Sequence, residues 1–394
     1  METLSKDQQH VLAALIEWYE KDKGSMQYVT LGGYAGTGKT TLIGHFRQEL
    51  ETHHTGIRVA FVSFTGKASR VLSQTIERTL STFKKDSVGT IHSLIYSPVV
   101  NDCEEIVGWK QKDEIECDLI IIDEASMVDG MIWEHLKRYG KPMVVVGDHG
   151  QLPPIQGNFN LMGKTDLKLE EIHRQSKDNP IIEVSILART HGSIPVGRYG
   201  KGVVKYNKGD SESQEALGEL LSGDISDTLL LCGFNATRKK LNAHMRAMAG
   251  IETAEPVSGD RVICLRNNHK KKIFNGMLGT VLHIRSTDSA WYEAEIQMDG
   301  EESVYSGLIY KDQFTAQESL NMTPNRALSK QGDLFDFGYA LTVHKAQGSQ
   351  AKRVILMEER FGKMSDDDWK RWLYTGVTRA QEELYIFGYE PPTF

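Results

Sequence analysis

The stretch Gly33-Tyr34-Ala35-Gly36-Thr37-Gly38-Lys39-Thr40 decides the fold of this chain. It reads G-x-x-x-x-G-K-T, the pattern of a loop that cradles the phosphates of a nucleoside triphosphate. The run before it, Tyr28 to Gly32, has the composition of a short buried strand, and the apolar residues of Thr41 to Leu50 recur at helical spacing. Strand, glycine loop and helix in this order predict an α/β fold in which the positive end of the helix faces bound phosphate.

Two side chains of this loop are expected to act on the phosphates. Lys39 would neutralise the β- and γ-phosphates, and Thr40 would hold Mg²⁺ through its hydroxyl group. A glycine-rich turn that binds nothing is the alternative, and the complete pattern between a strand and a helix argues against it. The residues expected to contact the nucleotide are Gly33, Ala35, Gly36, Thr37, Gly38, Lys39, Thr40 and Thr41.

The composition of the 394-residue chain leaves room for two or three domains but does not identify a function. Hydrophobic residues make up 40% and charged residues 25%, which is ordinary for a globular protein. The net charge of −7 gives no global electrostatic case for nucleic acid, so any such binding would use a local basic groove. No apolar run approaches the roughly 18–20 residues of a membrane helix, and the first residues show no secretory signal.

The four cysteines lie far apart and form no C-x-x-C pair. This spacing argues against a zinc ribbon, an iron–sulfur cluster or a disulfide scaffold. It fits a reducing compartment, and we therefore expect a cytoplasmic protein.

Two further predicted strands end in acidic or polar side chains. The run from Asp118 to Glu124 is apolar between acids, as in a central parallel strand that ends in two carboxylates. Asp123 is expected to complete the Mg²⁺ coordination, and Glu124 to orient or deprotonate the attacking water. A strand that ends in Asp-Glu is common by chance, but this one follows a phosphate loop. The strand from Met143 to Asp148 leads to Gln151, which is either a γ-phosphate sensor or part of a proline-stiffened loop.

Several other polar residues have two interpretations that the sequence alone leaves open. Gln8 forms a capping box with Ser5 at the start of the first helix, or it reads adenine. The segment 64–69 lies at the ligand edge of an open sheet, or it simply begins a helix. His92 is either a backbone-satisfied loop residue or a phosphate contact. Arg174 is either a solvated charge or reaches the nucleotide from across a cleft.

The second half of the chain changes character twice. Short, glycine-bounded strand patterns predict a small β-barrel insertion at roughly 275–333. From Tyr339 onward the pattern returns to α/β alternation, with a polar and basic turn at 342–349 and Arg379 near the end of a helix. Two α/β sections separated by inserts predict paired lobes around a cleft that holds ATP.

The motifs are more specific together than apart. In order they are G-x-x-x-x-G-K-T at 33–40, T-G-K-A at 65–68, D-E-A-S at 123–126, G-D-x-x-Q-L-P at 147–153, H-R-Q at 173–175, T-V-H-K-A-Q-G at 342–348 and Y-x-G-V-T-R-A at 374–380. This series resembles the helicase motifs of superfamily 1 and, within it, the RecD/Dda-like branch. The length and the motif spacing look like those of the Dda-type helicases of T4-like phages, and the resemblance spans roughly residues 4–388.

The resemblance implies an α/β fold with two RecA-like P-loop lobes. The first lobe would be 1–160, with a strand-separating pin inserted at 94–116. The second would be 161–274 and 334–394, with an SH3-like β-barrel inserted at 275–333. Ile106, Val107 and Trp109 are the candidate pin residues. The barrel insertion is shorter than in Dda and no single aromatic marks the pin tip, so the wedge is where this chain departs most from the family.

The resemblance also assigns roles to single residues. Gln8 would read adenine, Gln151 would sense the γ-phosphate, and Gly348 would lie beside the nucleotide. Arg174 and Arg379 would reach the γ-phosphate from the second lobe. The expected contacts with single-stranded DNA are Thr65, Gly66, Lys67, Thr90, His92, Pro153, Thr342, His344 and Lys345.

The protein implied by the resemblance is an ATP- and Mg²⁺-dependent monomeric motor that moves 5′ to 3′ along single-stranded DNA. Its partners would be single strands and junctions with duplex, with a single-strand-binding protein as a further candidate and no membrane. Its place would be the cytoplasm of a bacterial or phage-infected cell. A translocating ATPase that remodels protein–DNA complexes without efficient unwinding is the alternative. The arginine motifs expected for a second lobe argue against a non-motor ATPase with one P-loop lobe.

Overall fold

The computed structural model describes residues 4–390 except 79–82, 101–105, 155–158, 172–178, 224, 226, 269–270, 272, 317–319 and 321–330. The chain divides into two compact units, Met1–Glu183 and Val184–Phe394. The first unit extends beyond residue 160, where we expected the first lobe to end. The reason is that β8 (Leu167–Leu169) pairs with β1 (Tyr28–Gly33) and so completes the first sheet.

The first unit is built on a six-stranded parallel sheet in the order β3-β2-β6-β7-β1-β8. The predicted strands are confirmed to within about a residue at each end. The remaining strands of this sheet are β2 (Val59–Ser63), β3 (Ser87–Thr90), β6 (Leu119–Asp123) and β7 (Met143–Gly147).

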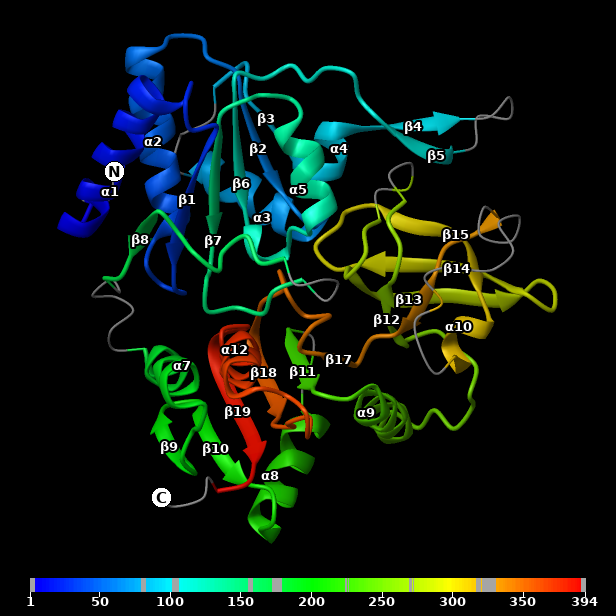
Figure 1. Ribbon diagram of the computed structural model, residues 1–394. Helices are drawn as coiled ribbons and strands as arrows, with labels where there is room; N and C mark the ends of the chain where they lie inside the picture. The colour runs from blue at the N-terminus through cyan, green and yellow to red at the C-terminus, as the bar shows by residue number, and fades with distance from the viewer. Residues whose placement is uncertain are drawn as a thin grey trace. The chain divides into compact units, whose positions relative to one another are not determined.

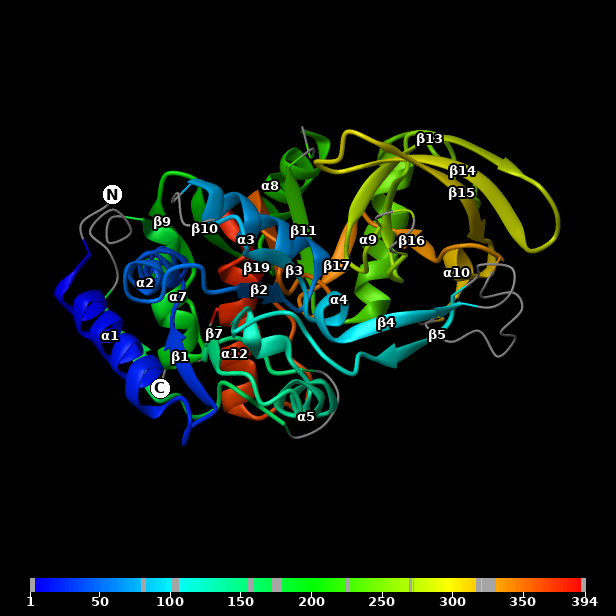
Figure 2. The same ribbon diagram turned by 90° about the horizontal axis from the view of Figure 1, so that it is seen from above.

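Helices cover both faces of this sheet (Figures 1 and 2). On one face, Leu42 and Phe46 of the helix after the phosphate loop pack against Leu31 and Val146. On the other face, Trp133 belongs to a second buried cluster. The helices on the first face are α1 (Lys6–Glu17), α2 (Lys39–His53) and α3 (Gly66–Arg78), and those on the second are α4 (Ile91–Ile95) and α5 (Gly130–Lys137).

A two-stranded antiparallel hairpin projects from the first unit between α4 and β6 (Figure 1). Its strands are β4 (Tyr96–Val100) and β5 (Ile106–Gln111). The hairpin lies inside the range 94–116, where we expected the pin insertion. Its action on DNA stays a prediction.

The second unit contains a six-stranded sheet in the order β17-β11-β18-β19-β10-β9, in which only β9 is antiparallel to its neighbour. This sheet is the second α/β section that the sequence predicted. Its strands are β9 (Gly197–Gly200), β10 (Val203–Asn207), β11 (Thr228–Cys232), β17 (Ala340–Thr342), β18 (Ala351–Met357) and β19 (Ala380–Gly388). The accompanying helices are α7 (Pro180–His191), α8 (Ser211–Ser222), α9 (Asn235–Met248) and α12 (Asp366–Val377).

A five-stranded antiparallel sheet, in the order β15-β14-β13-β12-β16, forms a further part of the second unit. Val262 and Phe337 pair across the ladder at one edge of the sheet, so the sheet begins before and ends after the range 275–333. Its elements are β12 (Arg261–Cys264), β13 (Leu278–Ser286), β14 (Trp291–Met298), β15 (Val304–Tyr310), the short helix α10 (Asp312–Thr315) and β16 (Phe335–Phe337). An SH3-like barrel stays a prediction for this region.

In the described ranges no helix combines the length and the apolar character that crossing a membrane requires.

Candidate nucleotide-binding site

The phosphate loop has the backbone that its glycines make possible. Gly36 and Gly38 have φ values of 81° and 73°, in the left-handed region that glycine adopts without strain. A Cβ atom at Gly33 would lie 2.6 Å from Oγ1 of Thr37, so this position has room only for glycine. Lys39 donates from Nζ to the carbonyl oxygens of Gly33 at 2.7 Å and Tyr34 at 3.2 Å. The amine is therefore held over the loop that would surround the phosphates. Ala35, Thr40 and Thr41 are partly exposed around it.

Gln8 satisfies the helix-capping interpretation and also reaches the loop. Its side chain and that of Ser5 form the predicted capping box of α1. Its Nε2 also donates to the carbonyl oxygen of Thr37 at 3.2 Å. The start of the first helix is thus tied to the phosphate loop, and adenine reading stays a prediction.

The strand ends next to the loop carry the predicted acidic pair. Asp123 ends β6, and β7 separates this strand from β1. Burial, followed by the charge of Glu124, raises the pKa of Asp123 to about 6. Glu124 has φ 54° and is the one non-glycine residue with positive φ in the described ranges. Strained backbone of this kind gathers at functional sites.

Three buried oxygen atoms at these strand ends lack a hydrogen-bond partner among the described residues. They are Oγ of Ser63, Oγ of Ser126 and Oε1 of Gln151. Ser63 ends β2 directly beside Asp123, and Ser126 follows Asp123 by three residues. The sequence analysis included Ser126 in the D-E-A-S motif but gave it no role. It missed Ser63, although a polar residue at the carboxyl end of a buried strand was a usable signal.

This donor set fits a nucleotide with Mg²⁺. Mg²⁺ is held in such sites by one or two protein oxygens together with phosphates and water. Thr40 and Asp123 supply such oxygens, and the unpaired oxygens nearby can accept or donate further bonds. Within the described ranges no group of three or more His, Cys, Asp and Glu side chains forms a protein-only metal cage.

An aromatic contact that the sequence interpretation also missed joins the phosphate loop to the loop after β7. The rings of Tyr34 and His149 lie 4.2 Å apart between centroids, tilted by 55°. Asp148, next to His149, is buried and accepts from Nε2 of Gln151 at 3.4 Å. The residue predicted to sense the γ-phosphate is therefore packed through two neighbours onto the phosphate loop.

The two arginines that were predicted to reach the γ-phosphate, Arg174 and Arg379, differ in what the structure describes of them. Arg379 is 2% exposed, and its guanidinium donates to the carbonyl oxygens of Thr375 at 2.9 Å and Ser349 at 3.2 Å and to Oγ1 of Thr378 at 3.2 Å. These partners all belong to the second unit. Gly348 has φ 72° in the turn before β18. Arg174 lies outside the described residues.

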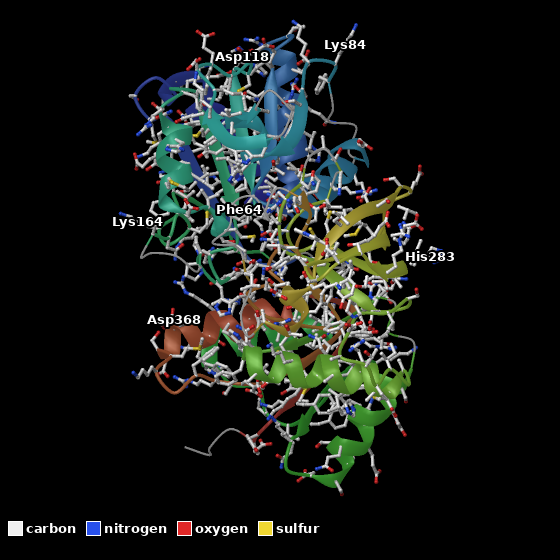
Figure 3. The ribbon with its side chains drawn as sticks, turned by 90° about the vertical axis from the view of Figure 1, so that its right-hand side faces the viewer. Phe64, Lys84, Asp118, Lys164, His283 and Asp368 are labelled. Carbon is white, nitrogen blue, oxygen red and sulfur yellow. The ribbon has the colours of Figure 1, made fainter. Side chains whose placement is uncertain are left out.

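The predicted DNA contacts of the first unit lie at helix starts. Oγ1 of Thr65 accepts from the Ala68 amide at 3.2 Å as α3 begins at Gly66, and Thr90 forms a capping box for α4. The centroids of the His92 and Phe64 rings lie 6.3 Å apart. Figure 3 shows Phe64 and Asp118 at opposite ends of the strands of this sheet. The helix-start interpretation is confirmed for 64–69, whereas His92 lies in α4 and not in the loop that one interpretation gave it, and DNA contact stays a prediction. Pro153 is partly exposed, and the side chain of Lys67 lies outside the described set.

The predicted contacts of the second unit cluster at the end of β17. Oγ1 of Thr342 accepts from the Lys345 amide at 3.3 Å. Burial lowers the pKa of both His344 and Lys345. Lys345 donates from Nζ to Oδ1 of Asn275 at 3.3 Å. The cluster is thus compact and polar, as a backbone contact would need.

On the hairpin, Trp109 is 45% exposed and pairs across the strands with Pro98. Val99, which the sequence interpretation did not select, is 41% exposed on the other strand. The side chains of Ile106 and Val107 lie outside the described set. The hairpin therefore presents apolar surface from both strands.

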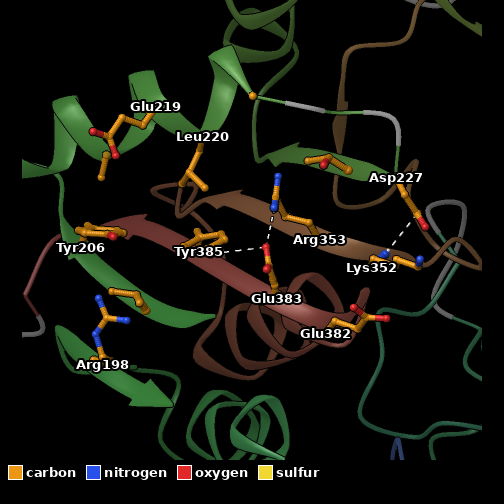
Figure 4. A pocket seen from close by; sticks show the side chains of 14 residues that line it. Arg198, Tyr206, Glu219, Leu220, Asp227, Lys352, Arg353, Glu382, Glu383 and Tyr385 are labelled. Carbon is orange, nitrogen blue, oxygen red and sulfur yellow. Dashed lines mark hydrogen bonds and ion pairs between the residues drawn. The ribbon is translucent and has the colours of Figure 1, made fainter. Parts of the chain in front are cut away.

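A cavity of about 660 Å³ lies in the second unit between α8 and one face of the sheet (Figure 4). Its charged lining mixes bases such as Arg198 and Lys352 with acids such as Glu219 and Glu383. None of the predicted site residues is among the side chains that line it.

Known proteins resemble this chain in sequence and in fold. Residues 3–206 match the AAA domain family, and 337–387 match the UvrD-like helicase C-terminal domain. The ATP-dependent RecD2 DNA helicase of Deinococcus radiodurans is 27% identical over 91% of this chain and 47% of its own length. The RecBCD enzyme subunit RecD of Haemophilus influenzae is 21% identical over 91% of this chain and 66% of its own length. The chain thus spans about half to two thirds of these relatives.

Solved structures share the fold over nearly the whole chain. A Pif1 helicase from Bacteroides, in complex with ADP-AlF3 and single-stranded DNA, matches with a TM-score of 0.58 and 17% identity over 99% of this chain and 94% of its own. A structure of two coordinating Pif1 helicases at forked duplex DNA gives 0.57 and 18% over 99% and 93%. Since the AAA match covers more than half of the chain, the chain belongs to the AAA domain family. The RecD relatives are similar in sequence to most of this chain, and the Pif1 structures share its fold.

Proposed function

We propose that this chain is an ATP-dependent DNA helicase that moves along single-stranded DNA and unwinds duplex. The observation that carries the proposal is the carboxyl edge of the first sheet. There the phosphate loop, the Asp123-Glu124 pair and Gln151 follow three adjacent strands, beside buried oxygens without partners among the described residues. A buried polar group without a hydrogen-bond partner destabilises the folded state unless a ligand supplies that partner.

In the ATP site, Lys39 would bind the β- and γ-phosphates and Glu124 would orient or deprotonate the attacking water. Mg²⁺, held by Thr40 and Asp123, would neutralise charge on the phosphates. Gln8 would read adenine, and Gln151 would sense the γ-phosphate. An arginine from a second lobe stabilises the charge that develops in phosphoryl transfer, which is the role we assign to Arg379. We assign the same charge-stabilising role to Arg174, which falls within the range of the first unit.

On the DNA side, polar residues at helix starts and strand ends suit a strand held through its backbone. The predicted contacts of both units are of this kind, with Pro153 as a surface on which bases could stack. Affinity would then fall with salt and depend little on sequence. The exposed apolar surface of the β4–β5 hairpin supports a role as the strand-separating pin, and the five-stranded antiparallel sheet suits an SH3-like support. By resemblance to Dda-type helicases, the direction is 5′ to 3′ and the motor is a monomer.

The test is ATP-dependent strand displacement on matched duplexes that carry either a 5′ or a 3′ single-stranded tail. Displacement from the 5′ tail alone would support both the motor and its branch. Displacement from the 3′ tail alone would keep the motor and remove the Dda-like assignment. Hydrolysis stimulated by single strands without displacement would leave the alternative, a translocase that remodels protein–DNA complexes.

A further inference from the structure

Both strands of the β4–β5 hairpin are tied at their root by side chains from one short region of the first unit. The Tyr139 hydroxyl lies 3.0 Å from the carbonyl oxygen of Ile95 and 2.8 Å from that of Lys112, one on each side of the hairpin. Nε2 of Gln111 donates to the His135 carbonyl oxygen at 3.1 Å. The Lys112 amide donates to Ile95 at 2.9 Å and closes the ladder between them.

The first strand has another anchor in His135, which lies on α5 four residues before Tyr139. The Tyr96 hydroxyl lies 2.5 Å from Nδ1 of His135, and the two rings meet edge-to-face at 5.7 Å between centroids. The Tyr96 hydroxyl is protonated at neutral pH, and burial raises its pKa further. His135 therefore contacts β4 through its ring and β5 through its carbonyl oxygen.

The helix that carries His135 is itself fixed to the start of β1 and follows β6 closely in sequence. α5 begins seven residues after Asp123, the last residue of β6. Trp133 of α5 packs edge-to-face on Tyr28, the first residue of β1, at 4.9 Å between centroids. Gln27, just before β1, donates from Nε2 to the carbonyl oxygen of Lys137 at 2.9 Å. No long linker separates the hairpin root from the strands that hold the phosphate loop and Asp123.

We propose that Tyr139, His135 and Gln111 form a root clamp that makes the hairpin move as one body with the nucleotide-binding sheet. A two-stranded hairpin alone is at best marginally stable in water, so one without such a clamp would bend when duplex pushes on it. The inference rests on the proposed function and concerns how motion reaches the duplex, not how ATP is hydrolysed. The three are positioning residues, since they act through the hairpin backbone.

The test separates unwinding from the motor that drives it. Tyr139→Phe keeps the ring and removes the hydroxyl between the two strands. We expect two rates to stay within about twofold of those of the parent protein: hydrolysis stimulated by single strands, and translocation along them. Unwinding of a 5′-tailed duplex should slow about fivefold, because the state in which the hairpin bends at its root becomes more populated. Gln111→Met should act in the same direction more weakly. Tyr199→Phe, which removes a hydroxyl bonded to Pro195 at 2.7 Å in the second unit, is the matched control and should change none of the three rates.

Hydrogen exchange supplies a readout that does not need DNA. The Lys112 amide should exchange several-fold faster in Tyr139→Phe while the amides of α5 keep their rates. Unchanged exchange at Lys112 would overturn the clamp. Faster exchange with unchanged unwinding, or an equal loss of hydrolysis and unwinding, would overturn its positioning role. A parent protein that hydrolyses ATP but displaces no strand would instead count against the proposed helicase function, and the exchange measurement would still decide the clamp.

Discussion

The proposed ATP site of the first unit and the Arg379 site of the second unit both contain buried polar atoms, but they differ in whether these atoms have hydrogen-bond partners. At the first, Ser63, Ser126 and Gln151 each keep an oxygen without a hydrogen-bond partner among the described residues. At the second, the guanidinium of Arg379 makes three hydrogen bonds to its own unit. One site is incomplete by itself, and the other is complete.

The unpaired oxygens of the first site can still bind a ligand, whereas the guanidinium of Arg379 is held in place by its own unit. An unpaired buried oxygen costs roughly 1–3 kcal/mol, which a bound ligand can recover. An arginine has five N–H donors, and three bonds leave it oriented without using all of them. Arg379 could therefore take a phosphate oxygen while its anchors persist, and we expect its removal to affect turnover more than nucleotide affinity.

The largest effect should come from Lys39→Ala at the incomplete site. The side chain is the one cation that the phosphate loop holds over itself, so hydrolysis should fall by about 10³-fold or more. Binding of single-stranded DNA, measured by fluorescence anisotropy, should persist because its predicted contacts lie elsewhere. Loss of both properties together would indicate misfolding or a wrong site.

Arg379→Ala should have the next largest effect. Turnover should drop about 10³-fold with ATP affinity nearly unchanged, because the arginine acts on charge that develops during the reaction. Nucleotide binding by calorimetry and single-turnover hydrolysis separate the two quantities. Arg379→Lys keeps the charge and one anchor and should recover part of the rate. A variant that hydrolyses ATP at the parent rate would remove Arg379 from the reaction.

The sequence predicted the α/β sections well because their strands are short apolar runs bounded by motif residues. The strands ending at Ser63, Asp123 and Gly147 stand within a residue or two of expectation. The boundary at 160 failed because Leu167–Leu169 is too short to signal a strand on its own and gains its partner only in three dimensions. The ends of the antiparallel sheet extended for the same reason, through the pair of Val262 with Phe337.

At the site, the sequence revealed residues whose chemistry follows from a pattern but not those whose role depends on a neighbour. Lys39 and Asp123 belong to motifs with a stated mechanism. The contact of Tyr34 with His149 joins positions more than a hundred residues apart, and no local periodicity encodes it. Gln8 shows the intermediate case, since its capping bond is local and its bond to Thr37 is not.

The smallest effect we predict concerns stability, and it contrasts the two ends of β6. Folding raises the pKa of Asp123 from 3.8 to about 6, so between these values the folded state binds more protons than the unfolded state. The free energy of unfolding therefore falls as pH rises through this window. Without nucleotide or metal, Asp123→Asn should raise Tm by about 5 °C at pH 8, and the gain should shrink as pH falls below 6. Calorimetry across pH 4 to 8 measures it.

Asp118, just before β6, provides the opposite sign in the same experiment. Its hydrogen bonds and ion pair with Arg58 lower its pKa, so its contribution to stability is present at neutral pH and disappears as pH falls. Asp118→Asn should therefore lower Tm slightly at pH 8 and have no effect in acid. If Asp123→Asn lowered Tm at pH 8, as Asp118→Asn should, the carboxylate of Asp123 would not be held at the cost of stability. If the ATP site is incomplete without its ligand, removing the charge of Asp123 should raise Tm, whereas removing the charge of the paired Asp118 should lower it. The opposite result at Asp123 would therefore contradict the interpretation that the site is incomplete.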